Sequence, residues 1–140
     1  MATTAEITIT SDIMPNFGTY YKKMTLTAAG TTTDIDSTTG FSRRKLAAAS
    51  VVDLITMANE LVETKDSTAA KVYIKNIGYK GVFDKSTYVL IGVKAQPIGR
   101  LYGGDWMIMP LTGIDADDVT ATPSTADAVV LEYAMYYEEN

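Results

Sequence analysis

The chain of 140 residues contains no histidine and no cysteine. Without histidine it lacks the most common general base, the Ser-His-Asp and Cys-His nucleophile pairs, and the ligand of nearly every zinc, copper or haem site. Without cysteine it has no disulfide framework and no thiolate ligand for a metal. Catalysis would have to rest on carboxylates, lysine or tyrosine. We therefore expect neither an enzyme nor a bound cofactor.

Basic residues are also in the minority. Twelve Lys and Arg stand against 17 Asp and Glu, which gives a net charge of −5 and a pI of about 4.6. A surface that binds nucleic acid needs clustered cations. The basic cluster in the chain is Arg43, Arg44 and Lys45. We interpret it as a solvated strand end or a contact between subunits, and we expect no nucleic-acid partner.

Long hydrophobic runs are missing as well. The apolar runs extend over only a few residues, which is too short for a transmembrane helix, so we expect no membrane partner. The first residues, MATTAEITIT, lack the basic and apolar regions of a signal peptide, so we do not expect secretion. The length suits one domain, and the hydrophobic content of 46% is that of a globular protein.

What the sequence does contain is alternation of apolar and polar residues with a period of two, which is typical of half-buried strands. The pattern occurs at residues 5–10, 20–30, 70–78, 86–93, 105–111 and 126–137. Turn residues separate these segments, as in 28–40, 76–86 and 112–118. Short strands with such punctuation predict an all-β protein, a single-domain antiparallel β-sandwich or barrel. We expect residues 1–18 to form an N-terminal strand or arm and residues 19–140 to form the sandwich domain.

Two segments allow the faces of the strands to be assigned. Near the C-terminus, alternation separates Val129, Leu131, Tyr133 and Met135 from Val130, Glu132, Ala134 and Tyr136. In residues 106–109 it separates Met107 and Met109 from Trp106 and Ile108. Because both faces of the latter segment are apolar, we expect one to meet the core and the other to meet a neighbouring subunit.

Residues 48–64, AASVVDLITMANELVET, fit two structures. The apolar residues recur at helical spacing and Ser50 is a possible N-cap, with Asp53 three residues later. The stretch VVDLITM also alternates acceptably as a strand, and an isolated helix is unusual in an all-β pattern. We expect at most one short helix around residues 50–62.

The glycine-rich stretch IGRLYGGDWMIMPL, residues 98–111, raises the question of a phosphate-binding loop. Gly99 and Gly104 have the spacing of a P-loop, but Asp105 and Trp106 replace its Lys and Ser or Thr. An aspartate there would repel phosphate. We interpret Gly103 and Gly104 as turn residues with positive φ, and we expect the Asp105 side chain to bond to the nearby backbone.

Acidic loops raise the question of calcium. Asp115 and Asp117 alternate as calcium ligands do, and Asp118 follows them, but an EF-hand beginning at Asp115 would need glycine and glutamate where Thr120 and Ala126 stand. A solvated turn is the favoured interpretation, and adventitious calcium binding at residues 115–118 is left open. A second acidic stretch contains Asp34 and Asp36.

Aromatic residues are the best candidates for contacts. The tyrosines near the C-terminus have no adjacent basic groups, and Glu138 and Glu139 follow them, so stacking on nucleic-acid bases is disfavoured. Tyrosine is common at protein interfaces because an apolar ring carries a hydrogen-bonding tip. The interface candidates are Tyr20, Tyr21, Arg43, Arg44, Trp106, Met107, Tyr136 and Tyr137.

Four strand motifs in the second half of the chain resemble those of a known group of proteins. They are Y-I-K-N at Tyr73–Asn76, V-L-I-G at Val89–Gly92, L-Y-G-G-D at Leu101–Asp105 and V-V-L-E-Y at Val129–Tyr133. Over about residues 70–137 the chain is similar to small virion structural proteins of tailed bacteriophages, especially phages of cyanobacteria and other aquatic bacteria. The resemblance implies a jelly-roll-like sandwich located in the virion, assembled in the host cytoplasm, and it assigns no functional residues.

Together these observations predict a virion structural protein, first of all a capsid decoration (cement) protein. Its partners would be further copies of itself, with a trimer favoured, and the major capsid protein or other virion proteins. A component of the neck, tail or fibre attachment is the alternative within this class. A carbohydrate-binding β-sandwich for host attachment is a further alternative, with Trp106 and the tyrosines as its stacking platform.

Overall fold

The computed structural model describes residues 3–10, 19–26, 37–47, 50–57, 70–78, 87–111, 118–124 and 129–137. The strands are β1 (Thr3–Thr10), β2 (Thr19–Leu26), β3 (Ser37–Thr38), β4 (Ser42–Leu46), β5 (Val52–Ile55), β6 (Ala70–Asn76), β7 (Val89–Val93), β8 (Gln96–Leu101), β9 (Trp106–Leu111), β10 (Val119–Pro123) and β11 (Val129–Tyr137). Every pair of neighbouring strands is antiparallel. The predicted all-β fold is confirmed.

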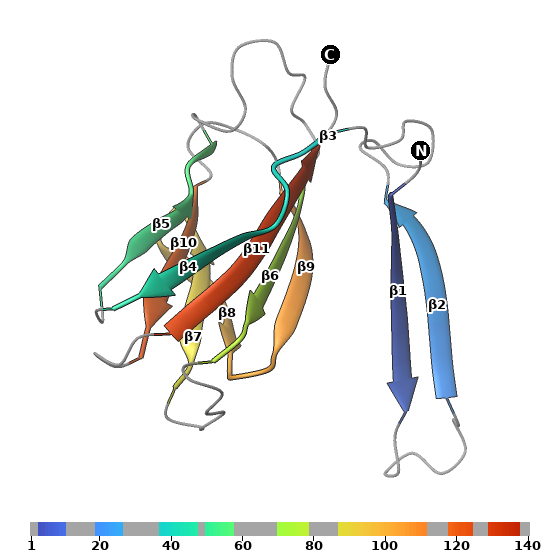
Figure 1. The fold of residues 1–140 in the computed structure, drawn as a ribbon, viewed down its shortest axis with the longest axis horizontal. Helices are drawn as coiled ribbons and strands as arrows, with labels where there is room; N and C mark the ends of the chain where they lie inside the picture. The colour runs from blue at the N-terminus through green and yellow to red at the C-terminus, as the bar shows by residue number, and fades with distance from the viewer. Residues whose placement is uncertain are drawn as a thin grey trace.

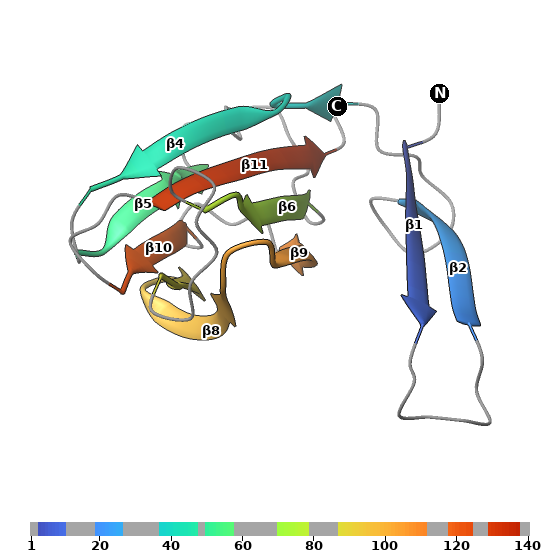
Figure 2. The ribbon, with the colours of Figure 1, turned by 60° about the horizontal axis from the view of Figure 1, so that its bottom comes forward.

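Two sheets form a sandwich (Figures 1 and 2). The first sheet has the order β3-β11-β6-β9, with β4 also pairing with β11, and the second has the order β5-β10-β7-β8. Because β3 and β4 pair with different parts of β11, they act as one interrupted strand. From β4 onward the chain crosses to the other sheet at every connection except the β7–β8 hairpin. This is the jelly-roll arrangement, in which one long hairpin is wrapped around the core.

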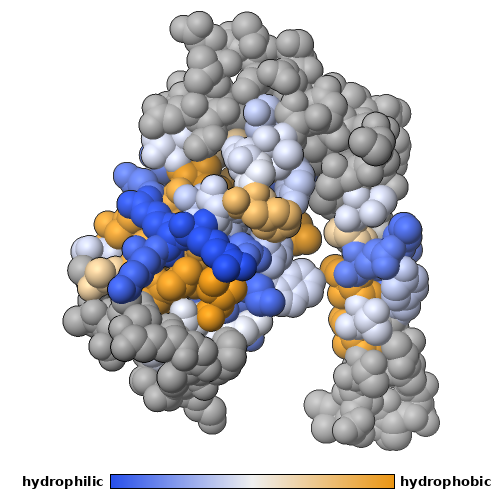
Figure 3. Space-filling model, in the orientation of Figure 1, coloured by the Kyte–Doolittle hydropathy of each residue, from blue (hydrophilic) through white to orange (hydrophobic). Residues whose placement is uncertain are grey.

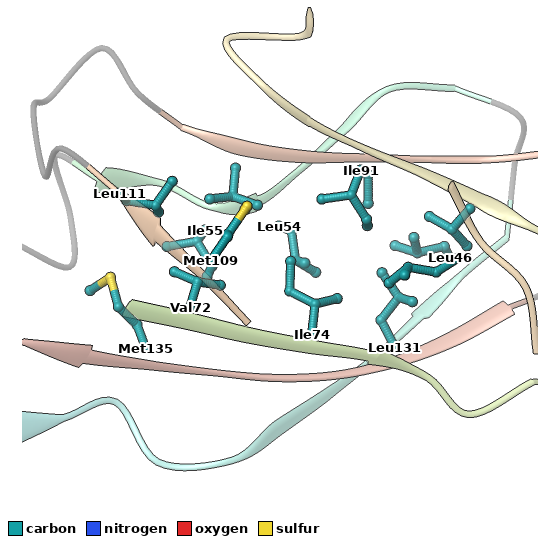
Figure 4. Close-up of a cluster of buried hydrophobic side chains, with 14 of the residues drawn as sticks. Leu46, Leu54, Ile55, Val72, Ile74, Ile91, Met109, Leu111, Leu131 and Met135 are labelled. Carbon is teal, nitrogen blue, oxygen red and sulfur yellow. The ribbon is translucent and has the colours of Figure 1, made fainter. Parts of the chain in front are cut away.

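The core lies between the two sheets (Figure 4). Alternate residues of β6 point into it, so Val72 and Ile74 are fully buried, and they face Ile91 of β7 in the opposite sheet. On β11 Leu131 and Met135, which alternation grouped on one face, are both buried. Complete burial of each such side chain contributes about 1.5–3 kcal/mol. The faces predicted for the C-terminal strand are therefore confirmed.

The segment whose structure was ambiguous begins as a strand. Residues 52–55 form β5, in which Leu54 and Ile55 are buried, and β5 pairs with β10. The strand interpretation is thus confirmed for residues 52–55, because burial against the core decides between the two patterns that the sequence allows. Residues 58–62 lie outside the described part of the chain.

A tight turn carries the chain from β8 in the second sheet to β9 in the first. The backbone N–H of Tyr102 donates to Asp105 Oδ2 at 2.9 Å, and the N–H of Asp105 donates to the carbonyl of Tyr102 at 2.9 Å. This confirms the predicted role of Asp105. Of the two glycines only Gly104 has a positive φ, at 95°, so the same expectation for Gly103 is wrong. The glycines build a connection between sheets.

The fully buried Asn76 joins this turn to β6. Its Nδ2 donates to the carbonyl of Leu101 at 3.0 Å, and its Oδ1 accepts from the N–H of Gly78 at 2.8 Å. Its backbone also bonds to the turn, through the N–H of Gly104 at 2.8 Å and the carbonyl of Asp105 at 2.9 Å. A buried amide with both ends satisfied fixes the position of the turn relative to β6.

The first two strands form a sheet of their own. β1 and β2 pair over their full lengths, from Thr3 opposite Leu26 to Thr10 opposite Thr19. The hairpin lies beside the sandwich (Figures 1 and 2). The boundary expected at residue 18 falls between these paired strands, so β2 belongs with the N-terminal arm. The sequence could not show this, since alternation in residues 20–26 fixes which side chains share a face and not which strands pair.

Within the described ranges, no helix has the length and apolar composition that a membrane span requires.

Candidate functional site

The outward side of the first sheet carries a group of large side chains, which we call the aromatic face. Strand register places Tyr73 of β6 opposite Ile108 of β9, and β11 lies on the other side of β6. Outward-pointing residues of neighbouring strands thus meet on one surface. The aromatic face consists of Phe41, Tyr73, Trp106, Ile108 and Tyr136.

This face is hydrophobic and accessible. Phe41 is 67% exposed, Trp106 46% and Ile108 36%. The rings of Phe41 and Tyr73 meet edge to face, with centroids 5.7 Å apart. Ala134, opposite Tyr73 on the same side of the sheet, is fully buried, so its larger neighbours pack over it. An exposed cluster of ordered apolar side chains is the usual mark of a binding surface.

A groove separates the aromatic face from the hairpin. Its volume is about 310 Å³. In Figure 3 the hydrophobic side chains of the hairpin lie on its side nearer the sandwich. The groove is lined by Thr4, Ala5 and Glu6 of β1, by Lys75, and by the five residues of the aromatic face.

Charged groups border the aromatic face. Arg43 binds Glu132 directly across the β4–β11 pair, with Nε and Nη2 each 3.0 Å from Oε2. Burial raises the pKa of Tyr73, and the nearby Glu132 carboxylate, which accepts its hydrogen bond, raises it further. Burial also raises the pKa of Tyr136. Both phenols therefore stay neutral well above neutral pH. Lys75 forms no ion pair within the described residues.

The hairpin contributes a second polar group to the groove. Glu6 forms an ion pair with Lys23 at 3.0 Å, and its hydrogen bonds to Lys23 and Tyr21 lower the pKa of its carboxyl group. The hydrogen bond between Tyr21 and Glu6 in turn raises the pKa of Tyr21, which is 56% exposed. For the other predicted tyrosine, Tyr20, the structure describes only the backbone, which pairs with Ile9.

Three predicted interface residues lie on one side of the first sheet. Trp106 and Tyr136 belong to the aromatic face, and Arg43 lies on the same side. The structure adds Phe41 and Tyr73, which were not predicted. Alternation already turned Tyr73 away from the core, but only the strand order shows that it lies beside β9.

Three other candidates lie elsewhere. Met107 and Tyr137 pack against the core, because neighbouring residues of a strand point to opposite sides and each follows an outward residue. They lie on the inward side of the sheet and not on the aromatic face, and their part in an interface stays a prediction. Arg44 connects β4 to β5, since its Nη1 donates to the carbonyl of Asp53 at 2.6 Å.

The acidic loops give no support for a metal site. Within the described ranges, no three acidic side chains lie close enough together to hold a metal ion. Asp118 Oδ1 accepts the backbone N–H of Met57 at 2.8 Å, which is a structural role. Asp115 and Asp117 lie outside the described residues, as do Asp34 and Asp36. Calcium binding at 115–118 stays a prediction.

A smaller aromatic cluster lies near the β8–β9 turn. The guanidinium of Arg100 lies 4.1 Å from the ring centroid of Tyr88, and the rings of Tyr88 and Tyr102 are 5.8 Å apart. Arg100 Nη1 donates a hydrogen bond to the Tyr102 hydroxyl at 3.4 Å, and this bond raises the already high pKa of Arg100. These groups satisfy one another, so we interpret the cluster as structural.

Comparison with protein-family models and with curated protein sequences finds no match to this chain. The arguments about function therefore rest on the residues and the geometry described above.

Proposed function

We propose that the chain is a structural protein of a tailed-phage virion, and specifically a capsid decoration protein. The observation that carries this proposal is the aromatic face, an exposed hydrophobic surface on the outward side of a paired sheet. The motifs that resemble phage virion proteins support the same reading. A fold alone does not establish a role, and jelly rolls serve many functions. The aromatic face is therefore the feature to test.

The strength of such contacts suits decoration of a lattice. Burial of the exposed parts of Phe41 and Trp106 would contribute about 3 kcal/mol each, taking about 200–250 Å² for a whole aromatic side chain. Association costs about 4–15 kcal/mol in lost translational and rotational freedom, so one such contact is weak by itself. Repeated contacts within one assembly add their effects through high effective concentration. A decoration protein would stabilise the head in this way.

A neck, tail or fibre-attachment component would use the same surface, so copy number separates the two roles. Immunogold labelling of intact purified virions, with densitometry of the same preparation, measures it. Hundreds of copies over the head would support decoration. A few to some dozens at one vertex would move the protein to the neck or tail. Absence from every particle would refute the virion role.

A variant tests the surface itself. We expect Trp106→Ala to lose most of its binding to heads that lack the decoration protein, with an unchanged melting temperature, because Trp106 points away from the core. The matched control is Ile98→Ala, which removes a side chain 54% exposed on β8 of the other sheet. Equal binding by the two variants would contradict a role for the aromatic face.

The groove favours a second candidate, a carbohydrate-binding module. A concave site of this size, with aromatic rings for stacking and a cation in Lys75, has the composition of a small-ligand site. Glycan-array binding that disappears in Trp106→Ala, while the protein remains folded, would support this candidate. Absence of glycan binding together with binding to heads would exclude it in favour of the structural role.

A further inference from the structure

One side of the β1–β2 hairpin is apolar and partly exposed to solvent. Ala5, Ile7 and Ile9 alternate along β1 and share that side, and Ile9 is 52% exposed. A two-stranded sheet is marginally stable in water unless another strand or a hydrophobic surface covers it. Within the described residues, no hydrogen bond or ion pair joins the hairpin to the sandwich.

The aromatic face has the complementary properties. It is apolar, its edge strand β9 ends the sheet, and Lys75 lies beside it. The hairpin brings Ala5 of its apolar side to the same groove, whereas the Glu6 carboxylate is already paired with Lys23. Each surface therefore offers exposed hydrophobic area that the other can cover.

In the single chain these surfaces do not close on each other. The groove between them, about 310 Å³, is the volume of roughly ten water molecules. Residues 27–36 connect the hairpin to β3, and ten residues can span up to about 35 Å. That reach is sufficient for the hairpin to extend to a neighbouring molecule.

We propose that the hairpin of one copy covers the aromatic face of a second copy, so that the chain forms a homo-oligomer by exchange of hairpins. The inference concerns the purified chain. The face that the neighbour's hairpin covers is the surface proposed above for lattice contacts, so the hairpin and the head would compete for it. Exchange between two copies gives a dimer, and a head-to-tail exchange closes a larger ring.

The contact area is adequate for such an assembly. Strands of eight residues are about 26 Å long, so one side of the hairpin covers about 250 Å². Two reciprocal contacts bury on the order of 1,000 Å² in total, near the lower bound for a specific interface. A contact within one chain would bury half of that.

The absence of cysteine makes a direct test possible, because introduced cysteines are the only thiols. Ala5→Cys on the hairpin and Ile108→Cys on the aromatic face are made as separate full-length chains, mixed and oxidised. We expect a disulfide-linked heterodimer, identified by intact mass, well above the amount in the control mixture. The control pairs Ala5→Cys with Ile98→Cys on the opposite sheet, where the side chain is 54% exposed against 36% for Ile108.

The other outcomes overturn the proposal. Heterodimer at the control level would show that the hairpin does not reach a neighbour's aromatic face. A chain with both Ala5→Cys and Ile108→Cys that forms only an internal disulfide would show that each hairpin covers its own face. Light scattering gives an independent check. We expect the unmodified chain at a multiple of 15.1 kDa, and Ile9→Lys as a folded monomer. A monomeric unmodified chain would refute the exchange while leaving binding to virions untouched.

Discussion

Replacement of Asn76 by alanine is the sharpest test of how the fold is held. The Asn76 amide bonds to the carbonyl of Leu101 and to the N–H of Gly78, and all of these bonds are buried. In Asn76→Ala both partners lose their bond without access to water. An unsatisfied buried group costs about 1–3 kcal/mol, so the expected loss for the two groups is about 2–6 kcal/mol. The total stability of a domain is only about 5–15 kcal/mol.

Urea denaturation followed by circular dichroism and by the fluorescence of the single tryptophan measures this loss. The control is Lys71→Ala, an outward position of the same strand, for which we expect a change of less than about 0.5 kcal/mol. A loss below about 1 kcal/mol in Asn76→Ala, with an unchanged dependence on urea, would refute the reasoning. It would mean that the turn keeps its place without the amide.

Three further predictions concern single positions. Gly92→Ala should destabilise the fold by about 1–3 kcal/mol, because a methyl group there would lie 2.6 Å from a backbone oxygen of β8. Gly99→Ala is the control, since the space around Gly99 is open, and its melting temperature should be close to that of the unmodified protein. The raised pKa of Tyr73 in the folded state contributes stability that is present below the ordinary tyrosine pKa of 10.0 and is lost as the pH rises through the raised value. Tyr73→Phe should therefore flatten the decline of stability that begins near pH 10.0 and ends above the raised pKa, as measured by denaturation at a series of pH values. Breaking the exposed Arg43–Glu132 pair with Arg43→Ala should cost less than about 1 kcal/mol, and the cost should shrink further in 1 M salt.

Much of the fold could be predicted from local patterns. Alternation grouped Leu131 with Met135 and separated both from Tyr136, because a strand covered on one side presents every second residue to the core, and both grouped residues are buried. The same rule separated Trp106 from Met107, without deciding which of the two faces the core. The hydrogen bond between the Asp105 side chain and the nearby backbone was also predictable, since a short carboxylate bonds readily to the backbone beside it.

Local patterns could not predict which residues make up the aromatic face. It depends on which strands are neighbours, and alternation carries no information on pairing. Tyr73 and Ile108 are 35 positions apart in the sequence, yet they lie opposite each other in β6 and β9. Phe41 lies between two short strands and belongs to no alternating run. Asn76 resembled an ordinary turn residue, although its amide is buried and fully bonded.

The position of β11 also sets the order in which the molecule can be built. This strand lies in the middle of its sheet, between β4 and β6, and it is the last of the described strands along the chain. Its partner residues are distant, as Arg43 and Glu132 show with 89 positions between them. Such non-local pairing slows folding, because a long loop must close before any contact compensates for its entropy. The β1–β2 hairpin needs no distant partner and is available first. During synthesis the chain thus presents a local hairpin and several unpaired strand edges until β11 emerges, a stage at which neighbouring nascent chains can associate.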